Sequence, residues 1–140
     1  MNNKAALNKF ENLYEKLNEI INLPEFIKHN AGYNLKLKNS GYMDLSVELL
    51  EKNTEFIFLS LTHYGKLNGD LMADPDMTVR INPKNKTAEA LTYQNDYISV
   101  YHEVYPEVNK INLLYKKQLN DFLHTWLCNL KNQGFKNNIY

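Results

Sequence analysis

Apolar side chains at three- and four-residue steps predict a helix near each end of the chain. In residues 3–22 the apolar positions fall on one stripe, and charged residues occupy the opposite side. The stripe consists of Leu7, Phe10, Leu13, Tyr14, Leu17, Ile20 and Ile21. This helix should end before Pro24, because a residue that precedes proline disfavours the helical conformation. A second stripe predicts a helix from Asn112 to Gln133, with Gly134 as its terminating residue.

Between the two helices, alternating apolar and polar residues predict strands. The segments with this pattern are Tyr33–Lys38, Tyr42–Leu50, Glu55–Tyr64, Met77–Ile81, Thr87–Tyr93 and Tyr97–Tyr105. Lys36 and Lys38 lie on the polar face of the first segment, which suits the edge of a sheet. Both faces of the third segment are apolar, which predicts a central strand that is covered on both sides.

These elements together define an α+β fold. The connections between strands are shorter than the crossovers that parallel pairing needs, so consecutive strands should pair antiparallel. We expect one antiparallel sheet of about five or six strands, bracketed by an N-terminal and a C-terminal helix that pack on one face. The length of 140 residues suits a single domain over residues 1–140.

An acidic segment, Gly69–Met77, interrupts the strand pattern and is predicted to be a loop. Asp70, Asp74 and Asp76 place three carboxylates within seven residues, and carboxylate oxygens are ligands for Ca²⁺ or Mg²⁺. Their spacing differs from that of an EF-hand, and aspartates also cap turns with their own side chains. A rigid structural loop is therefore favoured over a metal site, with a turn at its proline and with Leu71 and Met72 anchored in the core.

Two histidines lie in strands close to this segment. His63 precedes it at the end of the central strand, and a histidine with two carboxylates could form a hydrolytic metal site. His102 shares a strand face with Ile98, Val100 and Val104, where a hydrogen-bonded core histidine is favoured over a ligand. The sequence contains no glycine-rich phosphate loop and no nucleophile elbow, so it implies no cofactor.

Tyrosines form a third candidate feature. Tyr97, Tyr101 and Tyr105 follow at four-residue steps in the last predicted strand, and alternation places them on one face. If the helices cover the opposite face, these rings line the open sheet, where the large contact area of tyrosine suits a protein interface. The same row could stack nucleic-acid bases, or it could form a minor core beneath the loops.

The composition narrows the classes of function. Sixteen basic and sixteen acidic residues give a formal net charge of zero, whereas duplex-DNA binders usually carry a basic excess. A protein partner is thus favoured over a nucleic acid. The sequence has one cysteine and no apolar run that could span a membrane, so we expect a cytoplasmic protein without a membrane partner.

Four segments together resemble the pattern of an uncharacterised bacterial family of small proteins found on plasmids, phages and conjugative elements. They are Gly69–Met77 with the motif GDLMxDPDM, Tyr93–Tyr97, Tyr101–Tyr105, and Phe122–Phe135 with the motif WxxNLKxQGF. The resemblance covers the chain from about Thr62 to Phe135. It implies an accessory protein of a mobile element, and it assigns no activity to any residue.

The favoured hypothesis is a non-enzymatic, protein-binding accessory protein of a mobile genetic element, such as an anti-CRISPR inhibitor of a host defence nuclease. Carboxylates on a rigid sheet could face the basic channel of such a nuclease. The expected binding residues are Asp70, Asp74, Asp76, Tyr97, Tyr101 and Tyr105. The alternatives are a metal-dependent hydrolase or nuclease at the acidic segment, and a single-strand nucleic-acid binder that uses the sheet tyrosines.

Overall fold

The computed structural model describes residues 8–137 of the chain. Its elements, in chain order, are α1 (Lys9–Ile21), α2 (Leu23–Phe26), β1 (Asn34–Leu37), β2 (Leu45–Lys52), β3 (Ile57–Leu67), β4 (Asp70–Asn82), β5 (Thr87–Asn95), the 3₁₀ helix η1 (Asp96–Ile98), β6 (Val100–Glu103) and α3 (Leu113–Asn132). The first part of the predicted N-terminal helix, residues 3–7, lies outside the described residues.

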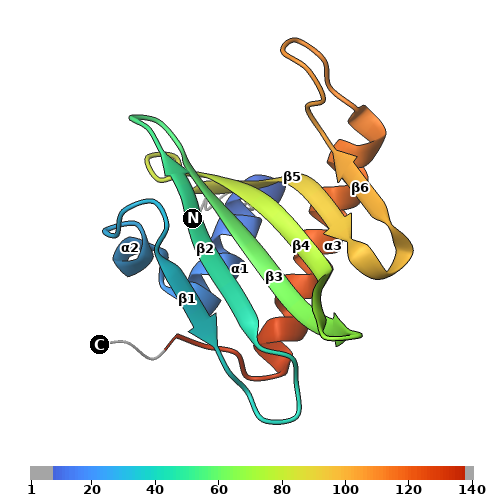
Figure 1. The fold of residues 1–140 in the computed structure, drawn as a ribbon. Coiled ribbons are helices and arrows are strands. Elements are labelled where there is room, and N and C mark those ends of the chain that lie inside the picture. The colour runs from blue at the N-terminus through green and yellow to red at the C-terminus, as the bar shows by residue number, and fades with distance from the viewer. Residues whose placement is uncertain (1–7, 138–140) are drawn as a thin grey trace.

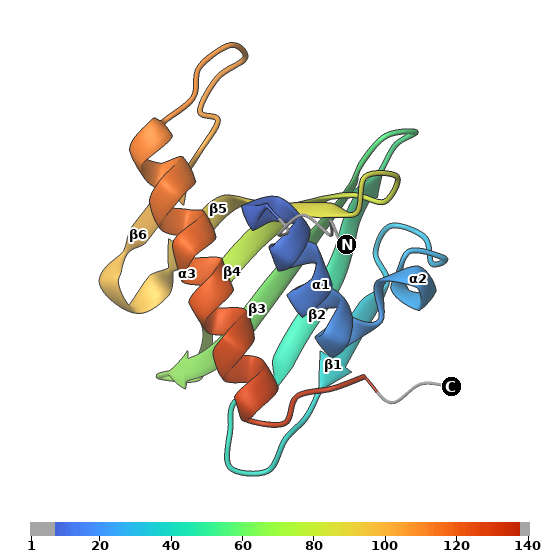
Figure 2. The same cartoon turned by 180° about the vertical axis from the view of Figure 1, so that it is seen from behind.

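The six strands form one antiparallel sheet in the order β1-β2-β3-β4-β5-β6, so each strand pairs with its neighbours in the sequence. Both long helices, α1 and α3, lie on one face of this sheet, and the other face is open (Figure 1). Figure 2 shows the helical face, on which α1 and α3 lie side by side. The predicted α+β class and its antiparallel meander are confirmed.

Local signals in the sequence determine where the long helices begin and end. Asn8 caps α1: its side chain accepts a hydrogen bond from the Glu11 N–H, and the Glu11 carboxylate accepts one from the Asn8 N–H. At the end of α3, Gly134 adopts a left-handed conformation with a φ of 91°. The Phe135 N–H then donates to the Leu130 carbonyl oxygen, which confirms the predicted glycine cap.

The core lies between the sheet and its two covering helices. It is built by the apolar stripe of each helix and by the alternating strand residues that face those stripes. Its fully buried members include Leu13, Leu17, Leu45, Leu59, Leu61, Met77 and Leu123. Burial of each such side chain contributes roughly 1.5–3 kcal/mol, so apolar patterning decides which side of the sheet the helices cover.

β3 is central in the sheet, as predicted, but helices cover only one of its faces. Phe58 alternates with the buried Leu59 and therefore faces the open side, where it is half-buried. Its ring lies edge-on to Phe56, and the Arg80 guanidinium lies 4.6 Å from the Phe56 ring centre. The prediction of a strand covered on both faces was wrong, because these side chains shelter one another without a second layer.

The two edges of the sheet are arranged differently. β1 forms one edge and exposes Lys36, which confirms the predicted edge strand. At the opposite edge, β6 pairs only with Thr92–Asn95 of β5. Beyond that point the Ala90 N–H donates to Asn120 Oδ1 of α3 at 2.8 Å, and the Asn120 side chain is completely buried. Helix α3 thus covers the part of β5 that β6 leaves unpaired.

Candidate functional site

The acidic segment is part of a β-hairpin rather than a loop. β3 and β4 pair from Leu67 and Asp70 inward, and Asn68 and Gly69 form the two-residue turn between them. Both turn residues have a positive φ, 52° and 86°, which an Asn-Gly pair adopts readily and which matches the twist of a hairpin. The predicted loop over Gly69–Met77 was wrong, because the Asn-Gly pair and not the later proline makes the turn.

The turn predicted at the proline is instead a β-bulge in a continuous strand. One residue of β3, His63, faces two residues of β4, Asp74 and Pro75. An extra residue of this kind bends the strand and increases its twist. Proline is tolerated at bulges because a bulged residue need not donate to the ladder. The Asp-Pro pair therefore redirects β4 without ending it.

Beyond the bulge, the hairpin extends past both neighbouring strands. β2 pairs with β3 no further than His63, and β5 pairs with β4 no further than Asp76. The outer part of the hairpin, Tyr64–Ala73, is consequently a two-stranded ribbon that projects from the sheet at the lower right of Figure 1. We call this part the hairpin ribbon.

The connection between β5 and β6 supports the hairpin ribbon. The Asp96 carboxylate accepts hydrogen bonds from Gln94 Nε2 at 2.8 Å and from the Ala73 N–H at 2.7 Å. The Gln94 bond, followed by the Ala73 bond, lowers the pKa of the Asp96 carboxyl. Asn95 Nδ2 donates to Asp74 Oδ1 at 2.8 Å. The acidic segment and the Tyr93–Tyr97 segment, which are separate in the sequence, therefore form one structural unit.

Tyr97 completes the contact between η1 and the hairpin ribbon. Its hydroxyl lies against Gly65, so close that a Cβ atom at this position would overlap it. A glycine is therefore needed here for the tyrosine to reach the backbone of β3. The Tyr97 side chain remains 44% exposed, so it both anchors η1 and stays accessible.

Large apolar side chains are exposed on the hairpin ribbon. Tyr64, Leu67 and Leu71 are 44, 48 and 62% exposed, although all three belong to strands. The prediction that Leu71 and Met72 anchor the segment in the core was wrong for Leu71, because the ribbon projects beyond the core, whereas Met72 is half-buried. Together with Tyr97 and with Asp70, which is exposed beside the turn, these side chains define what we call the hairpin-end surface. It wraps around the ribbon: Tyr64 and Leu71 lie on one face, and Leu67, Asp70 and Tyr97 lie on the other.

The other two aspartates of the segment are engaged within the sheet. Asp74 is half-buried and bonded to Asn95 at the end of β5, and Asp76 accepts a hydrogen bond from the Thr62 hydroxyl at 3.0 Å. Burial raises the pKa of the Asp76 carboxyl, which outweighs the opposite effect of the Thr62 bond. Asp70 is therefore the one of the three predicted carboxylates that is fully available to a partner.

The histidines do not join the aspartates. His63 is buried, where its Nδ1–H donates to the Asp44 carbonyl oxygen at 2.9 Å and its ring packs edge-on against Trp126. His102 is half-buried and stacks on Tyr115 of α3 with ring centres 4.3 Å apart, so its contact is aromatic rather than the predicted hydrogen bond. Within residues 8–137, no group of three or more His, Cys, Asp or Glu side chains is arranged to hold a metal ion.

The predicted row of tyrosines is not formed. The strand expected over Tyr97–Tyr105 is interrupted by η1, where Asn95 Oδ1 accepts a hydrogen bond from the Tyr97 N–H. Tyr101 lies in β6 and is 56% exposed, whereas Tyr105 follows the end of that strand. The three residues therefore occupy three different structural contexts and do not continue one strand face.

Tyr105 belongs to a polar network that sequence reasoning missed. Its hydroxyl donates to the Glu89 carboxylate and accepts from Lys116 Nζ at 3.1 Å. Glu89 also pairs with Arg80 at 3.2 Å. The hydrogen bond with Tyr105, followed by the charge of Glu89, raises the pKa of Lys116. The members come from β4, β5, α3 and the segment after β6, so no local pattern in the sequence connects them.

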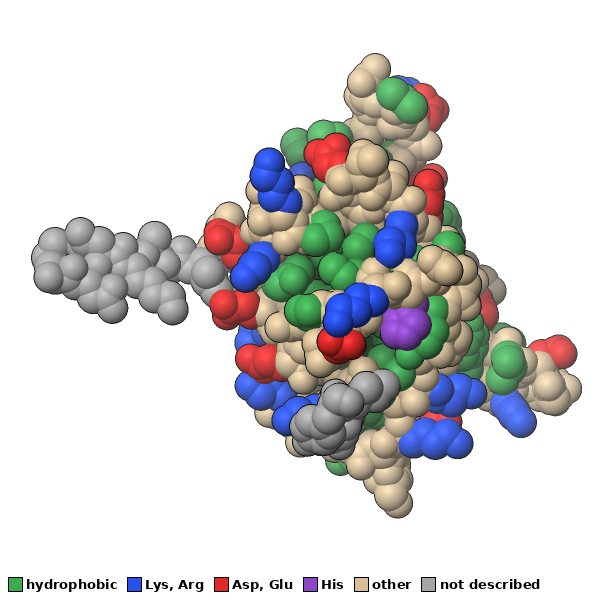
Figure 3. All heavy atoms as spheres, turned by 90° about the vertical axis from the view of Figure 1, so that its left-hand side faces the viewer, with side chains coloured by type: hydrophobic (Ala, Val, Ile, Leu, Met, Phe, Trp, Pro, Cys, Tyr) green, Lys and Arg blue, Asp and Glu red, His purple; other side chains and the backbone are tan. Residues whose placement is uncertain are grey.

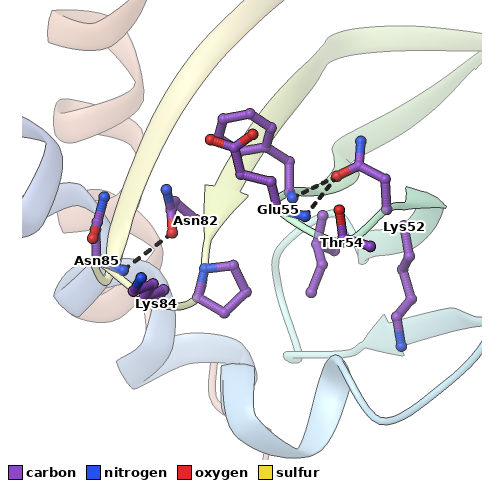
Figure 4. A pocket seen from close by; sticks show the side chains of 10 residues that line it. Lys52, Thr54, Glu55, Asn82, Lys84 and Asn85 are labelled. Carbon is purple, nitrogen blue, oxygen red and sulfur yellow. Dashed lines mark hydrogen bonds between the residues drawn. The ribbon is translucent and has the colours of Figure 1, made fainter.

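A hollow of about 570 Å³ lies between the β2–β3 and β4–β5 turns (Figure 4). Its labelled lining residues are Lys52, Thr54, Glu55, Asn82, Lys84 and Asn85. Asn82 Oδ1 accepts a hydrogen bond from the Asn85 N–H, and Lys52 Nζ donates to the carbonyl oxygens of Ile27 and His29. These polar groups stabilise the turns that carry them, and the hollow does not pair a nucleophile with a base.

The face of the molecule that Figure 3 shows has no dominant charge. Acidic and basic side chains are interspersed there around a group of hydrophobic side chains. This mixture agrees with the net charge of zero and produces no strong field of one sign for steering a nucleic acid. Among the helices of residues 8–137, none combines the length and the apolar character needed to cross a membrane.

The fold and the site define a small α+β domain with an open antiparallel sheet and a projecting hairpin ribbon. A family described as a domain of unknown function, DUF6908, matches residues 8–136. The chain therefore belongs to this family. The searches of curated proteins and of solved structures returned no match.

Proposed function

We propose that the chain is a protein-binding module that contacts its partner through the hairpin-end surface. The observation that carries this proposal is the exposure of Tyr64, Leu67, Leu71 and Tyr97 around a ribbon that hydrogen bonds hold in place. Exposed groups of large apolar side chains, rimmed by polar residues, mark sites of protein contact more often than single exposed residues do.

The hairpin ribbon suits this role because it is ordered before a partner binds. Asp96 and Asn95 tie it to η1, and the Asn-Gly turn sets the geometry of its end. A preordered surface loses less conformational entropy on binding than a flexible loop does. Its two tyrosines add a large contact area with few rotatable bonds.

The predicted binding residues divide into three groups, and one of these groups lies on the hairpin-end surface. Asp70 and Tyr97 belong to the hairpin-end surface, and Asp70 supplies a rim charge that favours a partner with a basic group nearby. Asp74 and Asp76 support the ribbon from within the sheet. Tyr101 lies on the neighbouring strand β6, and Tyr105 follows that strand, where its hydroxyl bonds Glu89 and Lys116.

The narrower hypothesis, an accessory protein of a mobile element that inhibits a host defence nuclease, is supported by the sequence resemblance alone. The hairpin-end surface contributes one exposed carboxylate, Asp70, to such an interface. Addition of the purified chain to a CRISPR nuclease of the host should then reduce target cleavage, and the Asp70→Lys variant should inhibit less. If a large molar excess of the chain left target cleavage unchanged, this hypothesis would be contradicted, and the protein-binding proposal would still stand.

The two alternative functions have less support in the described residues. A metal-dependent hydrolase needs ligands that converge, whereas Asp74, Asp76 and His63 each bond to a different group. A single-strand nucleic-acid binder needs a platform of stacked rings in a basic groove, and the predicted tyrosine row is interrupted by η1.

Cross-linking from the hairpin ribbon tests the protein-binding proposal. A photoreactive amino acid at Leu71 should give an adduct of one defined mass in a lysate of the source cell, and the purified partner should then bind the chain. The same amino acid at Leu50, which is 40% exposed on β2, is the matched control and should give no such adduct.

A substitution then measures the contribution of the surface. Leu71→Asp should weaken binding to the purified partner by about tenfold or more, because it places a charge in an apolar contact. Its circular dichroism spectrum should match that of the parent chain. Equal adducts from positions 71 and 50, or full affinity in the Leu71→Asp variant, would refute the proposed site.

A further inference from the structure

The outer edge of β6 carries unpaired backbone groups. On the inner side, the Val104 N–H donates to the Leu91 carbonyl oxygen of β5. In an antiparallel pair, the backbone groups of every second residue bond to the partner strand. His102 lies two residues before Val104, so its backbone groups also face β5. The N–H and C=O groups of Tyr101 and Glu103 therefore point away from the sheet. Figures 1 and 2 both show β6 as the last strand of the sheet, and none of the helices and strands of residues 8–137 pairs with its outer side.

β6 lacks the lysine, the proline and the bulge that can protect an exposed edge. At the opposite edge, β1 carries Lys36, and Lys38 follows it. Lysine on an edge strand discourages pairing with another chain. β6 has the sequence Val-Tyr-His-Glu and contains no lysine, no proline and no bulge toward β5. Its backbone is thus free to pair with an additional strand, which is a common mode of protein association.

Apolar side chains of α3 accompany this edge on the helical side. Helix α3 lies against β6 through the stacked rings of His102 and Tyr115, and against β5 through Tyr93 and Phe122 with ring centres 5.2 Å apart. Leu114 and Phe122 of this helix are 61 and 40% exposed.

We propose that β6 pairs antiparallel with β6 of a second copy of this chain, which joins the two sheets into one. The outward groups are self-complementary: with the two-fold axis at His102, Tyr101 of each copy faces Glu103 of the other. All four outward N–H groups and all four outward C=O groups of these residues are then paired across the axis.

The side chains of the edge fit the same register. On the open face each Tyr101 hydroxyl meets a Glu103 carboxylate of the other copy, and no like charges are opposed. The two side chains are already within 3.4 Å of each other inside one chain, so they have the reach for this contact. A strand of another protein would use the same backbone groups, but a second copy supplies the tyrosine–glutamate match at both positions. This association does not use the hairpin-end surface and is independent of the proposed function.

Sedimentation equilibrium of the full chain tests the proposal. The mass should rise with concentration from 16.5 kDa toward twice that value. Tyr101→Glu opposes two pairs of like charges across the axis and should raise the dimer dissociation constant about tenfold or more. Adding Glu103→Lys to that variant places a lysine at position 103 opposite the glutamate at position 101 of the other copy. This pairing of opposite charges requires the proposed register, and it should return the dissociation constant to within a few-fold of the parent value. Lys36→Glu on the β1 edge is the matched control and should leave it unchanged.

A covalent trap tests the register without a charge change. His102→Cys places two thiols opposite each other at the axis, so oxidised glutathione should convert the variant into a disulfide-linked dimer on a denaturing gel. Lys36→Cys should stay monomeric under the same conditions. A constant mass of 16.5 kDa up to about 1 mM chain, a dimer that Tyr101→Glu does not weaken, or the failure of His102→Cys to cross-link would overturn the proposal.

Discussion

At the scale of single residues, polar side chains complete backbone hydrogen bonds that strand pairing leaves open. Asn120 bonds the Ala90 N–H where β6 no longer covers β5, and Asp96 bonds the Ala73 N–H on the hairpin ribbon. Both act from a neighbouring element of the fold. Neither position stands out in the sequence, because hydrophobic periodicity marks burial of apolar groups and does not show which backbone groups lack a partner.

Replacement of Asn120 measures what such a bond contributes. Asn120→Ala leaves the buried Ala90 N–H without an acceptor, so we expect the free energy of unfolding to fall by about 1–3 kcal/mol. Urea unfolding followed by circular dichroism measures the loss. Asn129→Ala, at an exposed position of the same helix, is the matched control and should change stability by less than about 0.5 kcal/mol. Equal effects of the two substitutions would show that α3 does not satisfy the β5 edge.

At the scale of elements, most of the fold could be predicted from the sequence. Apolar residues that recur every 3.6 or every 2 positions show which side of a helix or strand is buried. This spacing predicts both long helices and the antiparallel meander. The proline and aspartates of Gly69–Met77 predicted a loop, and this prediction concealed the hairpin. The Asn68-Gly69 pair is a strong signal for a two-residue hairpin turn. The 3₁₀ helix η1 was missed for a different reason: the Asn95 cap bonds the Tyr97 N–H and overrides the strand pattern that follows.

The contact between α1 and α3 gives a pH-dependent prediction. Asp121 of α3 bonds Lys117 of its own helix and Lys9 of α1, and these bonds lower the pKa of its carboxyl from 3.8 to about 2. A lowered pKa means that the ionised form is the stabilising one. The contribution is therefore fully present above pH 3.8 and is lost as the pH falls through about 2.

Thermal unfolding of the Asp121→Asn variant checks this prediction. The variant should melt below the parent chain near neutral pH, and the difference should disappear as the pH approaches 2. Added salt should shrink the difference, because the pair is exposed and its charges are screened. Asn129→Ala, at an exposed position of α3 that carries no ionisable group, is the control and should show no such pH dependence. A difference that persists at pH 2 would assign the effect to packing instead.

At the scale of the whole molecule, the two edges of the sheet and its projecting ribbon divide the available surfaces. β1 is protected by lysine, and the unpaired part of β5 is covered by α3. The outer edge of β6 and the hairpin-end surface are two places, among the described residues, where a partner can add contacts. They lie on different strands, so a self-paired sheet would still present the ribbon of each copy to another protein.

Hydrogen exchange of the backbone amides distinguishes this arrangement from an isolated domain. The His102 N–H bonds to β5 within the chain, so it should be protected at every concentration. The Tyr101 and Glu103 N–H groups face outward and should exchange rapidly in dilute chain, then slow as the concentration rises and β6 pairs with β6. The Lys36 N–H on the opposite edge serves as the reference, and its exchange rate should not depend on concentration. Amide exchange at Tyr101 and Glu103 that stays fast in concentrated solution would mean that the edge of β6 remains open.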